Sequence, residues 1–178
     1  MISSLPMLPK KTQKTRTNSK FRRSIPYIIV CLAAVAVCSI ISLNFFRLML
    51  IQGESMSPTY HNLQLVLLDV RNREIQYDDV IAFKCDSQDI VLVKRVVGLP
   101  GDTLEIRNGK LYVNDLLSDY FANTNFLYSG VLNTEYTIPE GCCFAIGDNT
   151  DESIDCRYNE IGDVEIDNII GVIIPTGF

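Results

Sequence analysis

The hydrophobic positions of this 178-residue chain form one long run near the N-terminus and a series of short runs after it. Residues 25–43 contain no charged side chain, and a helix needs about 20 mostly apolar residues to cross a bilayer. We therefore predict one transmembrane helix, with an anchor over residues 25–46. A removable signal peptide shows a similar order of basic and apolar segments. Residues 44–47, however, resemble an interfacial anchor more than a small-residue cleavage site.

After residue 47 the apolar residues alternate with polar ones or form short runs between turn residues, which is the pattern of β-strands. Strands are predicted at residues 64–69, 80–84, 90–97, 104–107, 111–113, 143–146 and 170–174. Asn108 and Gly109 predict a tight hairpin turn, because both tolerate positive φ angles. The expected fold is mainly β, an antiparallel sheet or partial barrel after one N-terminal helix. Residues 114–133 show no pattern that assigns a structure.

The charge is distributed very unevenly along the chain. Residues 1–53 carry eight basic and no acidic side chains, whereas residues 54–178 carry eight basic and 21 acidic ones. Positive charge marks the cytoplasmic side of a membrane helix. We therefore predict a basic tail at 1–24 in the cytoplasm and a domain at 47–178 outside it. The acidic domain argues against nucleic acid as a partner.

No cluster of metal ligands and no phosphate-binding loop is visible in the sequence, so neither a metal nor another cofactor is expected. The six cysteines give no disulfide framework, since two of them lie in the predicted span and two more are adjacent. We expect them to behave as small, mostly buried apolar residues. The sequence leaves the redox state of Cys85, Cys142, Cys143 and Cys156 open.

A serine and a lysine are the candidate catalytic residues. Ser55 lies in a turn segment, and Lys94 lies in an apolar strand, on the same face as Leu92 and Val96. Burial there would lower the pKa of the lysine and leave a neutral amine that can accept the serine proton. A strand lysine can instead extend its ammonium group into water. The one histidine, His61, is expected at the surface of a polar turn.

Three blocks of the chain resemble, in order, those of the bacterial type I signal peptidases. They are Ser-Met-Ser-Pro-Thr at 55–59, Lys-Arg-Val-Val-Gly-Leu-Pro-Gly-Asp at 94–102, and Gly-Asp-Asn-Thr-Asp-Glu-Ser-Ile-Asp-Cys-Arg at 147–157. The resemblance implies that Ser55 is the nucleophile and Lys94 the general base. It implies that Ser153 orients the lysine amine, and that Asp155 and Arg157 form a buried ion pair that shapes the site.

The same resemblance places Gly53 at the oxyanion position and Met56 at the substrate cleft. A glycine at position 53 is similar to the short Gram-positive form of the family, and it leaves the backbone N–H of Ser55 as the main oxyanion donor. A second donor cannot be identified from the sequence. Some residues depart from the usual pattern: Thr150, Glu152 and Cys156 stand where arginine, asparagine and serine are common. Residues 78–80 are a poor copy of the usual Gly-Asp before a strand, and the glycine that often follows Arg157 by three residues is missing.

The resemblance implies a membrane-bound serine endopeptidase that cleaves N-terminal signal peptides after small residues, at Ala-x-Ala-like sites bound as an added β-strand. The implied partners are preproteins, the lipid bilayer and the secretion machinery. One alternative is a specialised maturation peptidase for pili or conjugation. Another is a non-catalytic membrane-anchored protein that binds preproteins, which is disfavoured because the chain keeps both Ser55 and Lys94.

Overall fold

The computed structural model describes residues 19–71 and 74–175, without the side chains of 19–23 and 40–44. Contacts divide the chain into two compact units, Met1–Ser42 and Leu43–Phe178. The predicted helix is present as α1 (Ser19–Phe45). Among the residues described, no helix is both long and apolar enough to cross a membrane. Most of the predicted basic tail, residues 1–18, lies outside the described residues.

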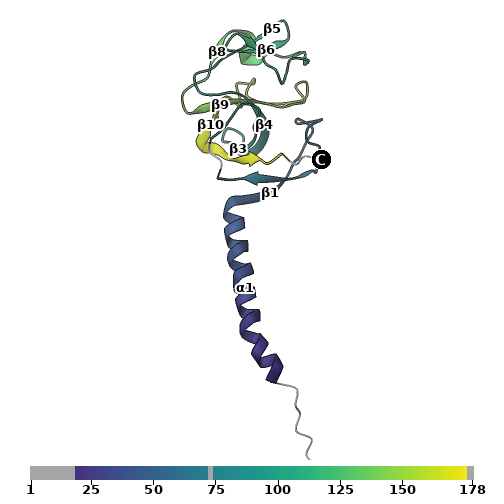
Figure 1. The fold of residues 1–178 in the computed structure, drawn as a ribbon. Helices are drawn as coiled ribbons and strands as arrows, with labels where there is room; N and C mark the ends of the chain where they lie inside the picture. Colours follow the sequence, from purple (N-terminus) through teal and green to yellow (C-terminus); the bar gives the residue numbers. More distant parts are fainter. Residues whose placement is uncertain (1–18, 72–73, 176–178) are drawn as a thin grey trace, which may run out of the picture. The chain divides into compact units, whose positions relative to one another are not determined.

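A seven-stranded antiparallel sheet forms the larger part of the second unit, and its strands follow the order β1-β2-β11-β3-β4-β9-β10. Of these strands, β1, β3, β4, β9 and β10 are labelled in Figure 1. The strands are β1 (Phe46–Leu50), β2 (Leu65–Asp69), β3 (Val80–Cys85), β4 (Ile90–Gly98), β9 (Cys142–Ile146), β10 (Val164–Glu165) and β11 (Ile169–Ile173). Each of the five strands predicted for this part of the chain has a counterpart here. The mainly β, antiparallel prediction is confirmed.

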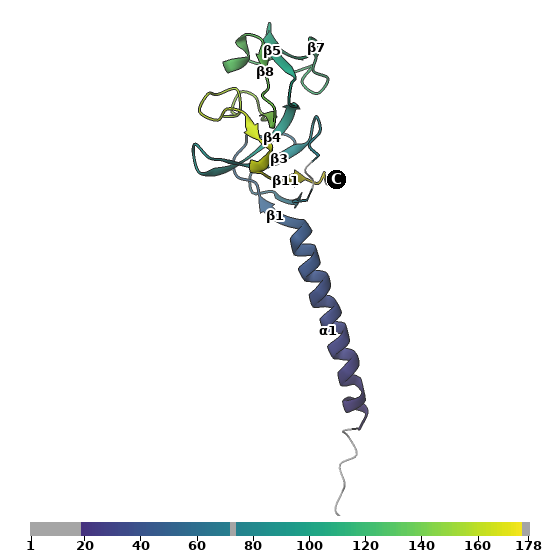
Figure 2. The ribbon, with the colours of Figure 1, turned by 90° about the vertical axis from the view of Figure 1, so that its left-hand side faces the viewer.

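A second antiparallel sheet has the strand order β7-β6-β5-β8. Its strands are β5 (Thr103–Arg107), β6 (Lys110–Val113), β7 (Leu116–Leu117) and β8 (Tyr136–Thr137). The predicted hairpin turn joins β5 to β6, with φ of +51° at Asn108 and +74° at Gly109. In both ribbon views this sheet lies at the end of the domain opposite β1 (Figure 1 and Figure 2). Two short 3-10 helices, η1 (Gly130–Asn133) and η2 (Ile166–Asn168), complete the described elements.

The boundary between helix and sheet differs from the sequence prediction. Phe46, assigned to the anchor, is the first residue of β1. This strand pairs with β2 in an antiparallel register that places Met49 opposite Val66 and Leu50 opposite Leu65. A short, almost continuous apolar run does not distinguish helix from strand by its periodicity. The pairing with β2 makes residues 46–50 a strand, and the local sequence pattern gives no sign of this pairing.

Two groups of buried apolar side chains stabilise the domain. The larger group joins the two sheets and includes Val96, Leu104 and Phe144. The smaller group packs Ile51 and Met56 against the strands of the larger sheet. Among the described residues all six cysteines are free, and Cys85, Cys143 and Cys156 are buried, so these three behave as the small apolar residues that were predicted.

Candidate active site

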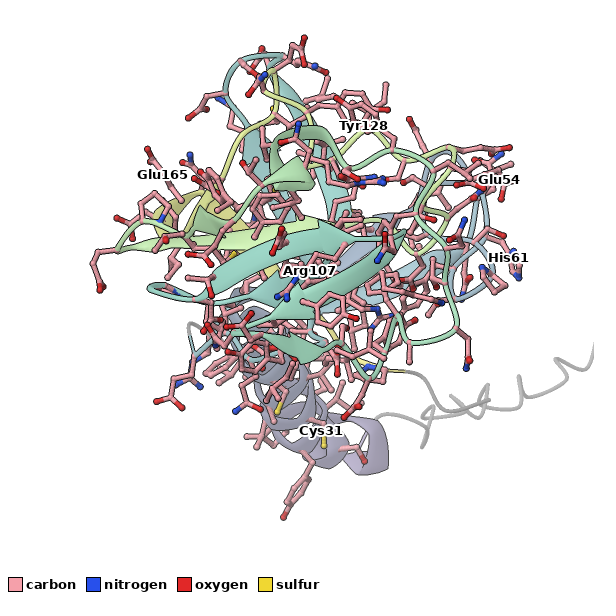
Figure 3. All side chains as sticks on the ribbon, turned by 90° about the horizontal axis from the view of Figure 1, so that it is seen from above. Cys31, Glu54, His61, Arg107, Tyr128 and Glu165 are labelled. Atoms are coloured by element: carbon pink, nitrogen blue, oxygen red, sulfur yellow. The ribbon has the colours of Figure 1, made fainter. Side chains whose placement is uncertain are left out.

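Ser55 lies on a loop between β1 and β2, residues 52–63, which we call the Ser55 loop. The two ends of the loop are held together at its base: the N–H of Ile51 donates to the carbonyl of Gln64 over 2.9 Å, and the N–H of Leu63 donates to the carbonyl of Ile51 over 2.8 Å. His61 is exposed on this loop, at the periphery of the domain in Figure 3. Its predicted surface position is confirmed.

Lys94 extends from β4 and contacts Ser55 directly. Its Nζ donates a hydrogen bond to Ser55 Oγ over 2.6 Å, and the residue is only 2% exposed. Burial lowers the pKa of Lys94 to about 8. The negative charge of Asp155 opposes this effect, because it favours the protonated amine and so raises the pKa. The predicted burial of Lys94 is therefore confirmed, and a hydroxyl and a readily deprotonated amine lie within hydrogen-bond distance.

A cleft of about 470 Å³ opens beside this pair. Apolar side chains from β1, Ile51, the Ser55 loop, β4 and β11 line it together with Ser55 and Lys94, and they include Met49, Met56, Leu92, Val93 and Ile170. Met56, predicted at the substrate cleft, is among them. Gly53 is not: it is exposed, and its N–H donates to Asn62 Oδ1 over 3.0 Å. The N–H of Gly53 is therefore not free to serve as an oxyanion donor.

Ser153 lies beside the backbone of Ser55, but no hydrogen bond joins it to Lys94. Its side chain is buried, and within the described residues its Oγ has no hydrogen-bond partner. Gly147 separates the two serines. A Cβ at that position would lie 2.2 Å from Ser153 Oγ and 2.5 Å from the carbonyl oxygen of Ser55. A glycine is therefore required for this close approach.

Asp155 and Arg157 form a fully buried ion pair, in which Arg157 Nε donates to Asp155 Oδ1 over 2.8 Å. The guanidinium also donates to the carbonyl oxygens of Tyr128, Thr150 and Ser153. The other carboxylate oxygen of Asp155 accepts a hydrogen bond from the N–H of Gly147. A buried charge needs both an opposite charge and further hydrogen bonds to be stable, and this pair has both. Through its hydrogen bonds to the carbonyl oxygens of Ser153 and Tyr128, Arg157 connects the segment around Ser153 to residues 114–133.

Residues 24–176 match the protein family described as signal peptidase, peptidase S26. The chain belongs to this family. Signal peptidase I U of Bacillus subtilis (strain 168) is 32% identical over 173 residues, which cover 90% of each chain. Signal peptidase I of Bacillus caldolyticus is 30% identical, over 89% of this chain and 92% of its own. A crystal structure of a signal peptidase I from Enterococcus faecalis V583 matches 57% of this chain and 97% of its own, with 31% identity and a TM-score of 0.46.

This signal peptidase contains a second buried ion pair that the sequence interpretation missed. Arg95, next to Lys94, donates to both carboxylate oxygens of Asp148 over 2.8 and 2.7 Å. The ring of Tyr120 lies 4.0 Å from the Arg95 guanidinium, and its hydroxyl donates to Asp148 over 3.0 Å. Thr59, on the Ser55 loop, also donates to Asp148. The network therefore connects the three signal peptidase blocks to residues 114–133.

Part of this network has a signal in the sequence. Arg95 and Asp148 belong to two of the blocks, and a charged residue in an apolar strand requires a partner when it is buried. Tyr120 has no such signal, because it lies in a segment without periodicity and its contacts depend on the tertiary fold.

Proposed function

We propose that this protein is a membrane-bound serine endopeptidase that removes signal peptides from exported preproteins. Ser55 is the nucleophile and Lys94 the general base. The observation that carries the proposal is the 2.6 Å contact between Lys94 Nζ and Ser55 Oγ, made by a buried lysine of lowered pKa in a chain of the signal peptidase family.

In the proposed reaction a neutral Lys94 accepts the hydroxyl proton of Ser55 while Oγ attacks the carbonyl carbon of the scissile bond. The resulting ammonium group then gives its proton to the departing amine, and an acyl-enzyme remains on Ser55. Lys94, neutral again, removes a proton from water, and the resulting hydroxide attacks the acyl carbon. The bond from this carbon to Ser55 Oγ then breaks, the ammonium group of Lys94 returns the proton to Oγ, and the signal peptide leaves with a free carboxyl group. Burial of the lysine supports this cycle because it favours the neutral amine at the start of each step.

The tetrahedral intermediate requires hydrogen-bond donors directed at its oxyanion. The backbone N–H of Ser55 is the donor that we propose. The loop geometry leaves Gly53 out of this role, because its own N–H is bound to Asn62.

The substrate binds, in this proposal, as an extended segment along β4. Residues 90–94 of this strand pair with β3 on one edge, whereas the pairing with β9 covers only residues 95–98. The second edge of residues 90–94, unpaired within the described chain, is open to a peptide strand beside the cleft. The apolar lining of the cleft suits small apolar side chains such as those of an Ala-x-Ala site.

We propose that the helical residues 25–45 anchor the enzyme, with residues 1–24 in the cytoplasm and residues 46–178 outside it. The charge asymmetry of the sequence supports this orientation. The described side chains of α1 from 24 to 39 are all exposed, and most of them are apolar. A helix that is apolar on every side requires an apolar environment.

Membrane vesicles that contain the full chain test function and orientation together. Right-side-out vesicles are expected to cleave an added preprotein without detergent, whereas inverted vesicles should do so only after detergent is added. Vesicles with Ser55→Ala provide the control and should be inactive in every condition. Cleavage by intact inverted vesicles would contradict the orientation, and absence of cleavage by the wild type in detergent would contradict the function.

The pH dependence of cleavage follows from the lowered pKa of Lys94. We expect kcat/KM to rise about tenfold per pH unit below pH 8 and to level off above it, because the free enzyme requires the neutral amine and the pKa is about 8. His61→Ala should give the same curve. A rise centred between pH 6 and 7 that disappears in His61→Ala would instead assign the base to the histidine.

A further inference from the structure

The cleft beside the nucleophile contains few polar side chains. Of the described residues that line it, three carry a side-chain hydrogen-bond donor, namely Gln52, Ser55 and Lys94, and the others are apolar. Two of these three are bonded to each other, because Lys94 Nζ donates to Ser55 Oγ over 2.6 Å. Among the described lining residues, Gln52 is therefore the one polar side chain that has no part in the proton transfer.

The proposed reaction requires strong stabilisation of the oxyanion. The Ser55 N–H supplies one hydrogen bond, and the loss of a single donor from an oxyanion hole typically lowers kcat by about 10²–10³-fold. The N–H of Gly53 is bound to Asn62 Oδ1, and glycine has no side chain that donates in its place. The amide of the preceding residue, Gln52, suits the role, because amide side chains serve as oxyanion donors and do not change their charge with pH.

The backbone of Gln52 is held close to the nucleophile. On one side, Ile51 is 3% exposed, and its N–H and carbonyl both bond to the far end of the Ser55 loop. On the other side, Gly53 is bound to Asn62. Gln52 precedes Ser55 by three positions, and both residues line the same cleft. The Gln52 side chain is exposed and makes no hydrogen bond within the described residues, so its amide is available to a bound substrate.

We propose that Gln52 is a catalytic residue whose Nε2 donates a second hydrogen bond to the oxyanion, beside the Ser55 N–H. This inference rests on the proposed serine peptidase function and deepens it. A peptide in the cleft displaces water from the amide, and the negative charge that develops on the scissile carbonyl oxygen attracts an N–H donor more strongly than the neutral oxygen does. The contribution of Gln52 is therefore larger in the transition state than in the bound substrate.

Gln52→Met tests the proposal, because it keeps the length of the side chain and removes both polar groups of the amide. We expect kcat for a signal-peptide substrate to fall roughly 10- to 100-fold, less than for the loss of a rigid donor, because the exposed side chain must first be ordered. KM should stay within about threefold of the wild-type value. In Ser55→Ala, which binds without cleaving, the added Gln52→Met change should leave the Kd of the same peptide within about threefold.

Gln52→Glu separates the donor of the amide from its acceptor. This variant keeps an oxygen acceptor and replaces the donor with a negative charge beside the oxyanion, so kcat should fall about tenfold below that of Gln52→Met. The variants are compared on the alkaline plateau of their pH profiles, because a carboxylate near Lys94 raises its pKa. Gln88→Met and Gln88→Glu are the matched controls. Gln88 is exposed in the turn between β3 and β4 and does not line the cleft, so both should cleave like the wild type.

Three results would overturn the proposal. Wild-type kcat in Gln52→Met would leave the second hydrogen bond to a backbone N–H or to water. Wild-type kcat in Gln52→Glu would show that the amide oxygen is the atom in use. A loss confined to KM in Gln52→Met would assign the residue to ground-state binding of the substrate. All three require an active wild-type enzyme and so leave the proposed function intact, whereas an inactive wild type would contradict the function itself.

Discussion

Replacing Lys94 with methionine is expected to abolish signal-peptide cleavage while the domain remains folded. Methionine has a similar length and no amine, so Ser55 loses its only proposed proton acceptor. Loss of an essential member of a catalytic pair typically lowers kcat by about 10⁴-fold or more. The measurement is kcat/KM for one preprotein substrate with purified full-length enzyme in detergent.

The same variant has an expected effect on stability. The pKa of Lys94 is lowered from 10.5 to about 8, so between these pH values the unfolded chain binds more protons than the native one and stability rises with pH. Below pH 8 the folded state carries the full cost of the buried amine, which corresponds to about 3 kcal/mol. Lys94→Met should therefore resist urea better than the wild type at pH 7, and this difference should vanish above pH 10.5. Retained cleavage by Lys94→Met would refute the role of the lysine as base.

Replacing Arg157 with leucine is expected to cause the largest loss of stability among single changes near the site. The substitution leaves Asp155 buried without its opposite charge and removes the donors to three carbonyl groups. Removal of one partner of a buried pair typically costs about 3–5 kcal/mol. Urea unfolding of the full chain in mild detergent measures this difference in the free energy of unfolding.

The exposed pair of Arg107 and Asp115, joined over 2.6 Å, supplies the matched control. Arg107→Leu should lower the free energy of unfolding by less than about 1 kcal/mol, because water already solvates both charges. The charge of Arg157 also lowers the pKa of Lys94, so any remaining activity of Arg157→Leu should rise at a higher pH than in the wild type. Equal stability of the two variants would show that the buried pair does not hold the domain together.

The local sequence pattern was sufficient to predict the strands that show regular alternation of apolar and polar residues or that lie next to strong turn signals. The hairpin at Asn108 and Gly109 illustrates this, because the turn chemistry is contained in two adjacent residues. For Lys94 the strand pattern allowed either burial or extension of the ammonium group into water, and the resemblance of the surrounding block to the signal peptidases favoured burial. Such features depend on neighbours in the sequence, and these are visible before the fold is known.

The features that were missed depend on contacts between distant segments. The strand that begins at Phe46 is defined by its pairing with β2, and the position of Tyr120 is defined by Arg95 and Asp148.

The place of β11 in the larger sheet has a consequence for the synthesis of the enzyme. This strand is the last that the structure describes, yet it lies between β2 and β3, and its Ile170 forms part of the cleft. Contacts between residues so distant in sequence form late in folding. The sheet can therefore close only after a ribosome has synthesised the chain as far as β11, so a shorter nascent chain does not yet have a complete cleft beside Ser55 and Lys94.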